Sequence, residues 1–374
     1  MRILIVGAGI AGLTLANLLR QRGLNPVIIE QRSEIKPRGY VLGLWPFGGR
    51  VLKGLGLYPK LESVSQSLVD FNIGGVGGQI FHTFQVQKIG QSFGNIQMVR
   101  RSELSALLAA PCLDDIRTNL SILSMTQEDA EVQVGFDDGS SEVFDLVVGC
   151  DGVGSDVRKM CLPNAQERDT GWSGFGWWTD PSVLPADAMS EYWDAGRKFC
   201  ALIPAPGALC TFVGVPNSAV PSGDDAALFE GLQAQFGDMG DAVTSAFEAR
   251  DGSKPIYRQD FRTLSMETWS NGRVMVIGDA ASAFFPFGGL GIGGSMAMES
   301  AAVLADELSR TDAHFVTNAL ASFEQRRRPR LETFEKAMQS VVDVKLANET
   351  PVPEMMGHMA EMFKSFRQLL SDPI

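Results

Sequence analysis

The sequence has few of the residues that build disulfide frameworks and metal centres. Its five cysteines are scattered over 374 residues and form no Cys-x-x-Cys pair, a pattern typical of reduced thiols in a cytoplasmic protein. The three histidines, His82, His314 and His358, never stand at the spacing of metal ligands. We therefore expect a cytoplasmic protein with no metal site.

Basic residues are outnumbered, and long apolar runs are missing. Lysine and arginine total 32 against 44 aspartates and glutamates, which gives a formal net charge of −12. Nucleic acid and anionic membranes repel such a chain, and a membrane-spanning helix needs about 20 mostly apolar residues, so we expect neither partner. The one basic cluster, residues 326–328 with Arg330, falls in an expected long helix and indicates a solvated or salt-bridged face. An anionic cofactor stays compatible with the charge, because local backbone N–H groups and single arginines hold phosphates.

The first thirty residues have the pattern of a strand, a glycine-rich turn, a helix and a second strand. The glycines form Gly7-x-Gly9-x-x-Gly12, and Glu30 ends the second strand. Gly7 permits the tight turn, Gly9 lets a pyrophosphate approach the backbone, and Gly12 lets the helix pack closely on the strand. Glu30 is placed to accept hydrogen bonds from ribose hydroxyls. The motif predicts a dinucleotide site on a βαβ unit and does not by itself distinguish FAD from NAD.

Two further glycine-rich turns follow buried strands. One is Gly149-Cys150-Asp151-Gly152, with Arg158 after it. The other is Gly278-Asp279-Ala280-Ala281, with Pro286 and Gly288-Gly289-x-Gly291 after it. A strand that ends in Gly-Asp places a carboxylate at the carboxyl edge of the sheet, where ligands bind in open α/β folds. We expect the turn at 278–281 to face a ligand at this edge.

The helix and strand patterns predict an α/β fold in which a sheet domain interrupts a Rossmann-like domain. Segments rich in glycine and aromatic residues have the alternation of antiparallel strands, and the last part of the chain has a helical pattern. The dinucleotide-binding domain is expected at 1–70, 98–170 and 266–315, the substrate-binding sheet domain at 71–97 and 171–265, and a helical segment at 316–374.

The three motifs together resemble those of the class A flavoprotein monooxygenases, the p-hydroxybenzoate hydroxylase type. Arg101-Ser102-Glu103-Leu104 is similar to that family's Arg-x-x-Leu helix start, and Phe323-Glu324-x-x-Arg327-x-x-Arg330 to its Tyr-Glu-x-x-Arg-x-x-Arg run. The resemblance covers most of residues 1–335 and fades at 171–265. It implies a glutathione reductase-type FAD-binding domain, with FAD as cofactor and NAD(P)H as reductant.

The resemblance also implies roles for single residues. Glu30 would bind the adenosine ribose, Arg101 the ribityl-phosphate region, and Asp279 the ribityl chain or the nearby phosphate. Pro286 would lie along the isoalloxazine ring. The remaining cofactor contacts implied are Gly7, Gly9, Ala11, Gly12, Arg38, Asp151, Arg158, Gly289, Leu290, Gly291 and Ile292.

In this family reduced flavin and O2 form a C4a-hydroperoxide that hydroxylates an aromatic or polycyclic small molecule. We expect the substrate pocket between the flavin loop and region 171–265, in a monomer or homodimer. Tyr192, Tyr257 and His82 are candidates to act as a base or to orient a phenol, with a structural role as the alternative for each. Candidates for an aromatic lining, with ordinary sheet core as the alternative, are Trp172, Trp177, Trp178, Tyr192, Trp193 and Phe212.

Other functions use the same scaffold. A flavin-dependent halogenase would carry Trp-x-Trp-x-Ile-Pro, which residues 176–179 do not match. A prenyl-lipid reductase is disfavoured by the lack of a basic or amphipathic membrane segment, but the C-terminal helices keep this alternative open. A flavin-binding protein without turnover is suggested by Leu290 and Gly293, which replace polar residues usual in the family.

Overall fold

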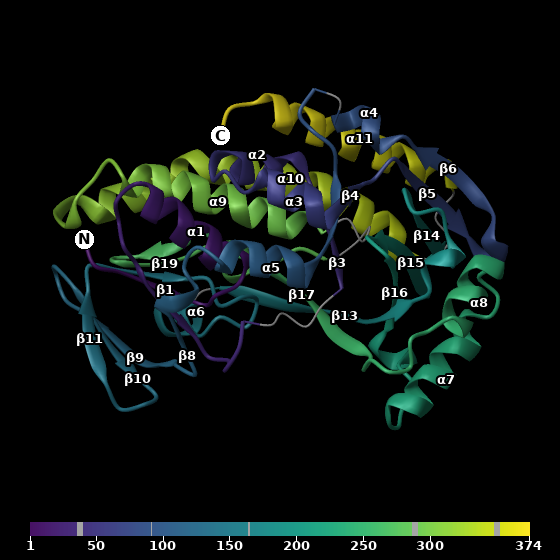
Figure 1. The fold of residues 1–374 in the computed structure, drawn as a ribbon, viewed down its shortest axis with the longest axis horizontal. Helices are drawn as coiled ribbons and strands as arrows, with labels where there is room; N and C mark the ends of the chain where they lie inside the picture. The colour runs from purple at the N-terminus through teal and green to yellow at the C-terminus, as the bar shows by residue number, and fades with distance from the viewer. Residues whose placement is uncertain (36–39, 91, 164, 286–290, 348–351) are drawn as a thin grey trace.

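The computed structural model describes residues 1–35, 40–90, 92–163, 165–285, 291–347 and 352–374. Arg38, Pro286, Gly289 and Leu290 lie outside these ranges. Within them the chain forms two large sheets, two small sheets and a set of helices above them (Figure 1).

The first large sheet has six strands and is mostly parallel. Its order is β18 (Ser270–Asn271), β19 (Val274–Val276), β12 (Leu146–Gly149), β1 (Ile3–Val6), β2 (Val27–Glu30) and β8 (Ile116–Thr118). All neighbours pair in parallel except β18 and β19. β1, β12 and β19 are buried along their whole length, as expected for parallel strands covered on both faces. The three motif turns therefore leave the same edge of one sheet.

The second large sheet has seven strands and is mostly antiparallel. Its order is β17 (Tyr257–Ser265), β13 (Gln166–Thr179), β16 (Ala208–Pro216), β15 (Lys198–Ala205), β14 (Ala188–Asp194), β5 (Asp70–Gly75) and β6 (Ile80–Phe84). Only β14 and β5 pair in parallel. The small sheets are β11 (Ser141–Phe144), β10 (Val132–Phe136) and β9 (Ile122–Gln127), and β3 (Val41–Leu44), β7 (Gln97–Arg100) and β4 (Ser65–Ser67).

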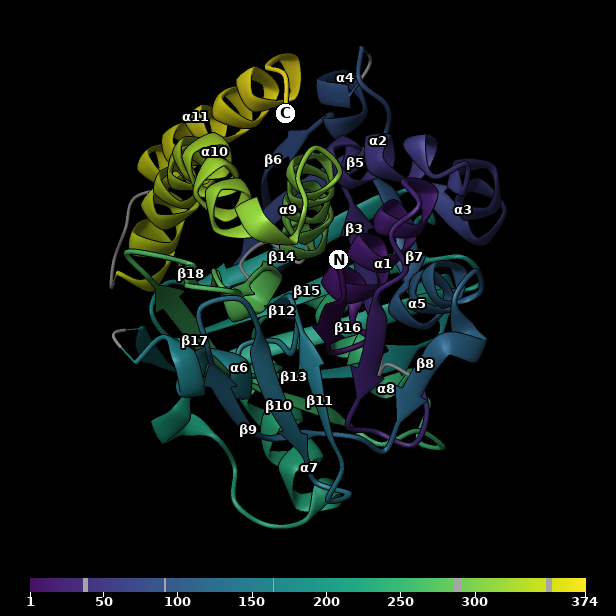
Figure 2. The same cartoon turned by 90° about the vertical axis from the view of Figure 1, so that its left-hand side faces the viewer.

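Helices cover both large sheets. α1 (Ile10–Gln21), α5 (Arg101–Ala109) and α9 (Ile292–Leu308) lie against the six-stranded sheet, and α10 (Val316–Leu346) and α11 (Val352–Ser371) lie beyond α9 (Figure 2). α7 (Asp225–Phe236) and α8 (Asp241–Glu248) cover the outer face of the seven-stranded sheet. The remaining helices are α2 (Pro46–Gly54), α3 (Tyr58–Val64), α4 (Val86–Gly90) and α6 (Asp156–Cys161).

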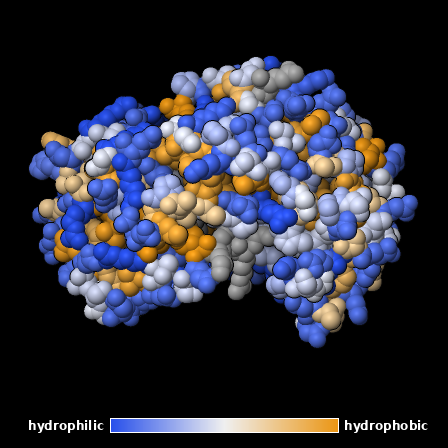
Figure 3. Space-filling view, in the orientation of Figure 1, coloured by the Kyte–Doolittle hydropathy of each residue, from blue (hydrophilic) through white to orange (hydrophobic). Residues whose placement is uncertain are grey.

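The seven-stranded sheet separates two hydrophobic clusters. Phe175, Trp177 and Tyr192 pack with α7 and α8 on the outer face. Side chains one position away, such as Trp193 and Phe212, point to the inner face and join the main core. The period of two along a strand produces this division. Figure 3 shows a hollow between the part that holds the six-stranded sheet and the part that carries α7 and α8, with apolar side chains gathered beside it.

α9 begins one turn earlier than its sequence pattern indicates. We expected its start at about Met296, because glycines disfavour helix interiors. The helix instead starts at Ile292, after Gly291 in a left-handed conformation with φ of 55°. The position before the helix admits only glycine, because a Cβ on Gly291 would come within 2.8 Å of the backbone nitrogen of Gly43.

Candidate active site

The first glycine loop has no room for side chains where the chain turns. Gly7 has φ of 101°, and a Cβ there would lie 2.7 Å from the Cys150 carbonyl oxygen. A Cβ on Gly12 would lie 2.0 Å from the Gly7 carbonyl oxygen. Gly9 differs, because it is exposed and its Cβ would meet nothing closer than 3.9 Å. The loop therefore admits no side chain at Gly7 and Gly12, and its open backbone at Gly9 precedes the N-terminus of α1, as a pyrophosphate site requires.

Glu30 is fixed at the end of β2, beside this loop. Its Oε2 accepts a hydrogen bond from the Ala8 N–H at 3.0 Å, and its Oε1 accepts one from the Arg32 N–H at 3.1 Å. A carboxylate has about four lone-pair positions, so both oxygens keep acceptor capacity for a pair of ribose hydroxyls.

Asp279 and Arg101 come from distant segments and meet at the site. Asp279 is solvent-exposed, yet desolvation by the surrounding protein raises its pKa, which the charge of Arg101 partly offsets. A Cβ on the preceding Gly278 would lie 2.9 Å from the Ala11 Cβ, so the Gly-Asp turn abuts the first glycine loop. A Cβ on Gly293 would lie 3.8 Å from Asp279 Oδ1, so the first turn of α9 also lies beside this carboxyl group.

Asp151 and Arg158 occupy the turn between these groups. Asp151 Oδ2 accepts hydrogen bonds from the N–H groups of Asp156 and Val157, at the start of α6, while its Oδ1 is buried without a partner in the described ranges. Burial raises the pKa of this carboxyl group. The buried Arg158 donates to the carbonyl of Ala280 at 3.0 Å and pairs with Glu167 at 2.9 Å. Arg158 thus ties the second motif turn to the third, and direct cofactor contacts of Asp151 and Arg158 stay predictions.

The predicted tyrosines separate into different environments. Tyr257 lies on the inner face of β17, where its hydroxyl and that of Tyr40 each lie 3.2 Å from Gln259 Oε1. The two tyrosine rings are 4.8 Å apart between centroids. Burial raises the pKa of Tyr40 far above its usual value, Tyr257 raises it further, and Arg101 partly opposes both. Tyr40 is therefore a neutral phenol that touches the sheet and lies near Arg101.

Tyr192 and His82 are not brought to Tyr257. Tyr192 points to the outer face of β14 and packs in the cluster under α7 and α8, which favours the structural role given as its alternative. His82 is exposed on edge strand β6, with its ring 4.4 Å from that of Phe84. Phe84 packs on Phe363 of α11. The position of Tyr192 follows from strand alternation, which the aromatic composition of the segment did not reveal.

The aromatic lining also divides between the faces. Trp172, Trp193 and Phe212 belong to the inner cluster, Trp178 packs against it, and Trp177 lies on the outer face. Three inner-face or adjoining phenylalanines were missed by the sequence reasoning: Phe199, Phe261 and Phe285. Their aromatic rings pack one against the next, and the ring centroids of Phe261 and Phe285 are 4.9 Å apart. Strict alternation along β15 and β17 would have indicated the first two.

The basic cluster on α10 is salt-bridged, but only part of it is a surface feature. Arg326 pairs with Asp306 and Glu307 at the surface. Arg327 and Arg330 are buried, and both bind the carboxylate of Glu299 in α9, at 2.7 and 2.9 Å. Of the two alternatives expected, these two residues follow the salt-bridged one, and they do so in the interior.

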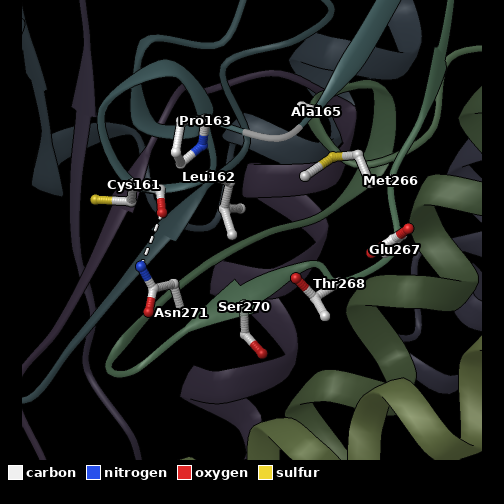
Figure 4. Close-up of a pocket in the computed structure, with 9 residues that line it drawn as sticks. All are labelled: Cys161, Leu162, Pro163, Ala165, Met266, Glu267, Thr268, Ser270 and Asn271. Carbon is white, nitrogen blue, oxygen red and sulfur yellow. Dashed lines mark hydrogen bonds between the residues drawn. The ribbon is translucent and has the colours of Figure 1, made fainter.

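A separate pocket lies away from the glycine loops. It holds about 550 Å³ of space, part of it open to solvent, between the end of α6 and strand β18 (Figure 4). Its lining residues are Cys161, Leu162, Pro163, Ala165, Met266, Glu267, Thr268, Ser270 and Asn271. None of the predicted site residues is among them. In the described ranges no cluster of three or more His, Cys, Asp or Glu could hold a metal ion, and no helix there is long and apolar enough to cross a membrane.

Comparisons with known proteins agree with this geometry. The family model for the FAD binding domain matches residues 1–338. The chain is 27% identical over 338 residues to the 2-heptyl-3-hydroxy-4(1H)-quinolone synthase of Pseudomonas aeruginosa, covering 90% of this chain and 87% of that protein. It is 27% identical over 365 residues to the FAD-dependent urate hydroxylase of Mycolicibacterium vanbaalenii, covering 94% and 90%.

Solved structures share the fold. HpxO from Klebsiella pneumoniae, crystallised with FAD and uric acid, has a TM-score of 0.84 at 24% identity, covering 98% of this chain and 93% of that one. The expected α/β architecture with C-terminal helices is confirmed. The chain therefore belongs to the FAD-binding domain family of FAD-dependent monooxygenases, and its cofactor is FAD.

Proposed function

We propose that this protein is an NAD(P)H-driven hydroxylase of an aromatic or heteroaromatic small molecule. The observation that carries the proposal is the position of Arg101, whose backbone N–H donates to the Tyr40 carbonyl at 2.9 Å beside the inner face of the sheet and whose charge opposes the burial that raises the pKa of Asp279 in the third motif. The cofactor groups and the aromatic face of the second sheet thus meet at one residue. The activities named for the quinolone synthase and the urate hydroxylase, both on nitrogen heterocycles, support this class of substrate.

The FAD site fits residues that the structure brings together. The open backbone at Gly9 and the N-terminus of α1 would hold the pyrophosphate, and Glu30 the adenosine ribose. Arg101 and Asp279 would bind the ribityl-phosphate part. The N-terminus of α9 at Gly291 and Ile292 would approach the isoalloxazine ring, together with Pro286, Gly289 and Leu290. These three residues and Arg38, a further proposed FAD contact, lie outside the described ranges. Bound FAD supplies the redox chemistry with NAD(P)H and O2.

The chain's own residues would orient the substrate and exclude water. Tyr40 is held protonated by burial, so it acts as a hydrogen-bond donor. Gln259 Oε1 lies within reach of Tyr40 and Tyr257 and keeps the two phenols in one place. The inner aromatic face would stack on a flat ring and shield the reacting atoms from solvent. In this division the six-stranded unit holds FAD, and the seven-stranded sheet carries the substrate wall.

The location is proposed to be the cytoplasm. All five cysteines are free and buried, which suits a reducing compartment.

Anaerobic reduction of the purified protein by NADPH and by NADH tests the function. The flavin's visible band is followed with and without aromatic ligands, including 4(1H)-quinolone and uric acid. Faster bleaching with a ligand, followed by hydroxylated product when air is admitted, is the expected result. A flavoprotein that neither nucleotide reduces would contradict the proposal and favour a two-component halogenase or a binding role.

A further inference from the structure

The inner face of the seven-stranded sheet carries one formal charge in its three central strands. Inward residues of β14, β15 and β16 are apolar or small, apart from Glu191 of β14. Glu191 is 0% exposed. Burying a lone carboxylate on an aromatic face is energetically unfavourable unless it is paired. The groups around Glu191 therefore indicate its role.

Glu191 is paired by the last turn of α10. The Lys345 ammonium is 1% exposed and lies 2.7 Å from Glu191 Oε1 and 4.4 Å from the centre of the Trp193 ring. The Trp193 indole N–H donates to the same carboxylate oxygen. Burial lowers the pKa of Lys345, and the charge of Glu191 opposes that effect. Both donors therefore converge on Oε1.

The second carboxylate oxygen of Glu191, Oε2, is not bound by either donor. It is buried and has no hydrogen-bond partner among the described residues. Leaving a buried acceptor unsatisfied is unfavourable, and more so when it is charged. A buried acceptor that lacks a protein donor is available to a donor group on a ligand.

Glu191 lies on the same face of the seven-stranded sheet as Tyr257, and a row of paired residues across the strands connects the two. It pairs with Ala201, Ala201 with Phe212, Phe212 with Gly176, and Gly176 with Tyr257. Adjacent strands are about 4.8 Å apart, so Glu191 and Tyr257 stand at the two ends of an apolar floor about 19 Å wide.

A line of rings leads from this end toward the flavin side. Trp193 stacks on Phe199 at 4.6 Å, Phe199 lies 6.4 Å from Phe261, and Phe261 lies 4.9 Å from Phe285. Phe285 directly precedes the residues expected along the isoalloxazine ring.

We infer that Glu191, held by Lys345, is a specificity-determining residue that accepts a hydrogen bond from an N–H or O–H group of the aromatic substrate. The inference rests on the proposed function and adds the polar feature that selects among aromatic molecules: a donor at the end remote from Tyr257. Molecules without a donor would leave Oε2 unpaired and bind less well.

Matched ligand pairs test it by calorimetric titration of the FAD-loaded protein. The probes are 4(1H)-quinolone against 1-methyl-4-quinolone, and 2-naphthol against 2-methoxynaphthalene, because methylation removes the donor and keeps the rings. The wild type is expected to bind at least one donor about 10-fold tighter than its methylated partner. Absence of any such preference, including absence of binding by every probe, would overturn the inference.

Variants assign the preference to Glu191. Glu191→Gln alone leaves Lys345 buried without its counter-charge, so the main variant is Glu191→Gln with Lys345→Met, which removes both charges. It should retain FAD and bind the two members of each pair within about 2-fold. Lys198→Met is the matched control, since Lys198 makes a similar pair with Asp238 and lies over Phe236, on the outer face of the same sheet. Its donor preference should stay intact.

Ligand binding tests the role of Glu191, and flavin reduction tests the proposed function, so failure of one can be distinguished from failure of the other. A donor preference that survives in the double variant would overturn the role of Glu191, whatever the enzyme's activity. NADPH reduction of the wild-type flavin, measured on the same preparation, reports on the proposed function independently.

Discussion

Glu299→Gln tests whether the buried arginine cluster holds the flavin-side helix in place. Glu299 is 0% exposed in α9, and its carboxylate accepts from Arg327 at 2.7 Å, from Arg330 at 2.9 and 3.0 Å, and from Arg50 at 2.5 Å. Removing one partner of a buried pair typically costs about 3–5 kcal/mol, because the remaining charge is left uncompensated. Here one neutralised carboxylate leaves three guanidinium groups, one of them fully buried. We expect a loss of about 3 kcal/mol in the free energy of unfolding.

The assay is urea denaturation of the variant beside Glu142→Gln. Glu142 also has two arginine partners, Arg2 and Arg117, but at the surface, where such pairs contribute about 1 kcal/mol or less. Glu299→Gln should also lose FAD at lower urea concentrations than the wild type, because α9 begins at the expected flavin edge. Equal destabilisation by the two variants would refute the argument that burial gives the cluster its strength.

The pH dependence gives a second check on Glu299. Burial alone would raise its pKa, but Arg327, Arg330 and Arg50 outweigh burial, so the pKa lies below the ordinary 4.5. A depressed folded-state pKa adds stability above the unfolded value, and that stability is lost as the pH falls through the folded value. The difference between wild type and Glu299→Gln should therefore be full at neutral pH and shrink in acid below about 4.5. A difference independent of pH down to acid unfolding would contradict this.

Further variants examine single contacts. Gly12→Val should abolish FAD loading, measured by the ratio of flavin to protein absorbance, since a Cβ there would lie 2.0 Å from a carbonyl oxygen; Gly252→Ala, with open space around it, should load normally. Glu30→Gln should weaken FAD binding about 10-fold in a fluorescence titration, and unchanged affinity would remove Glu30 from the ribose site. Tyr257→Phe should raise KM for the aromatic substrate about 5- to 10-fold with a smaller effect on kcat, because it removes a hydrogen-bonding hydroxyl and keeps the ring; an unchanged KM would contradict the placement. Tyr192→Phe, on the outer face, should change KM and kcat less than about 2-fold, and a large drop would reinstate it as a site residue.

The FAD half of the molecule could be predicted because its constraints are local. A turn that admits only glycine, such as the one at Gly7 and Gly12, leaves a mark at fixed spacing, and Glu30 and Asp279 stand at strand ends that the same spacing locates. The sheet half lacks such marks. Its strands are aromatic on both faces, so composition alone could not separate Trp177 from its neighbour Trp178.

Long-range charge pairing was equally hidden. Glu191 and Lys345 are 154 positions apart, and neither stands in a motif. Arg327 and Arg330 stand in a recognisable run, yet their burial depends on Glu299 of another helix. Spacing predicts which residues share an element, whereas partners across elements follow from how the elements pack.

The substrate side of the site follows from strand alternation once the sheet register is known. The aromatic composition of the segment made Tyr192 a candidate base. Its neighbour Glu191, one position earlier on β14, is the residue that lies on the inner face and to which we assign a role instead. The same step separates Phe199 from Lys198 in the adjacent strand. Because a register shift by one residue would exchange the two faces, the aromatic floor and its single carboxylate are properties of the pairing, and not of the residue types alone. The residues that recur in the family's motifs can therefore be located from its glycine turns, whereas the selectivity proposed for this chain depends on the register of its second sheet.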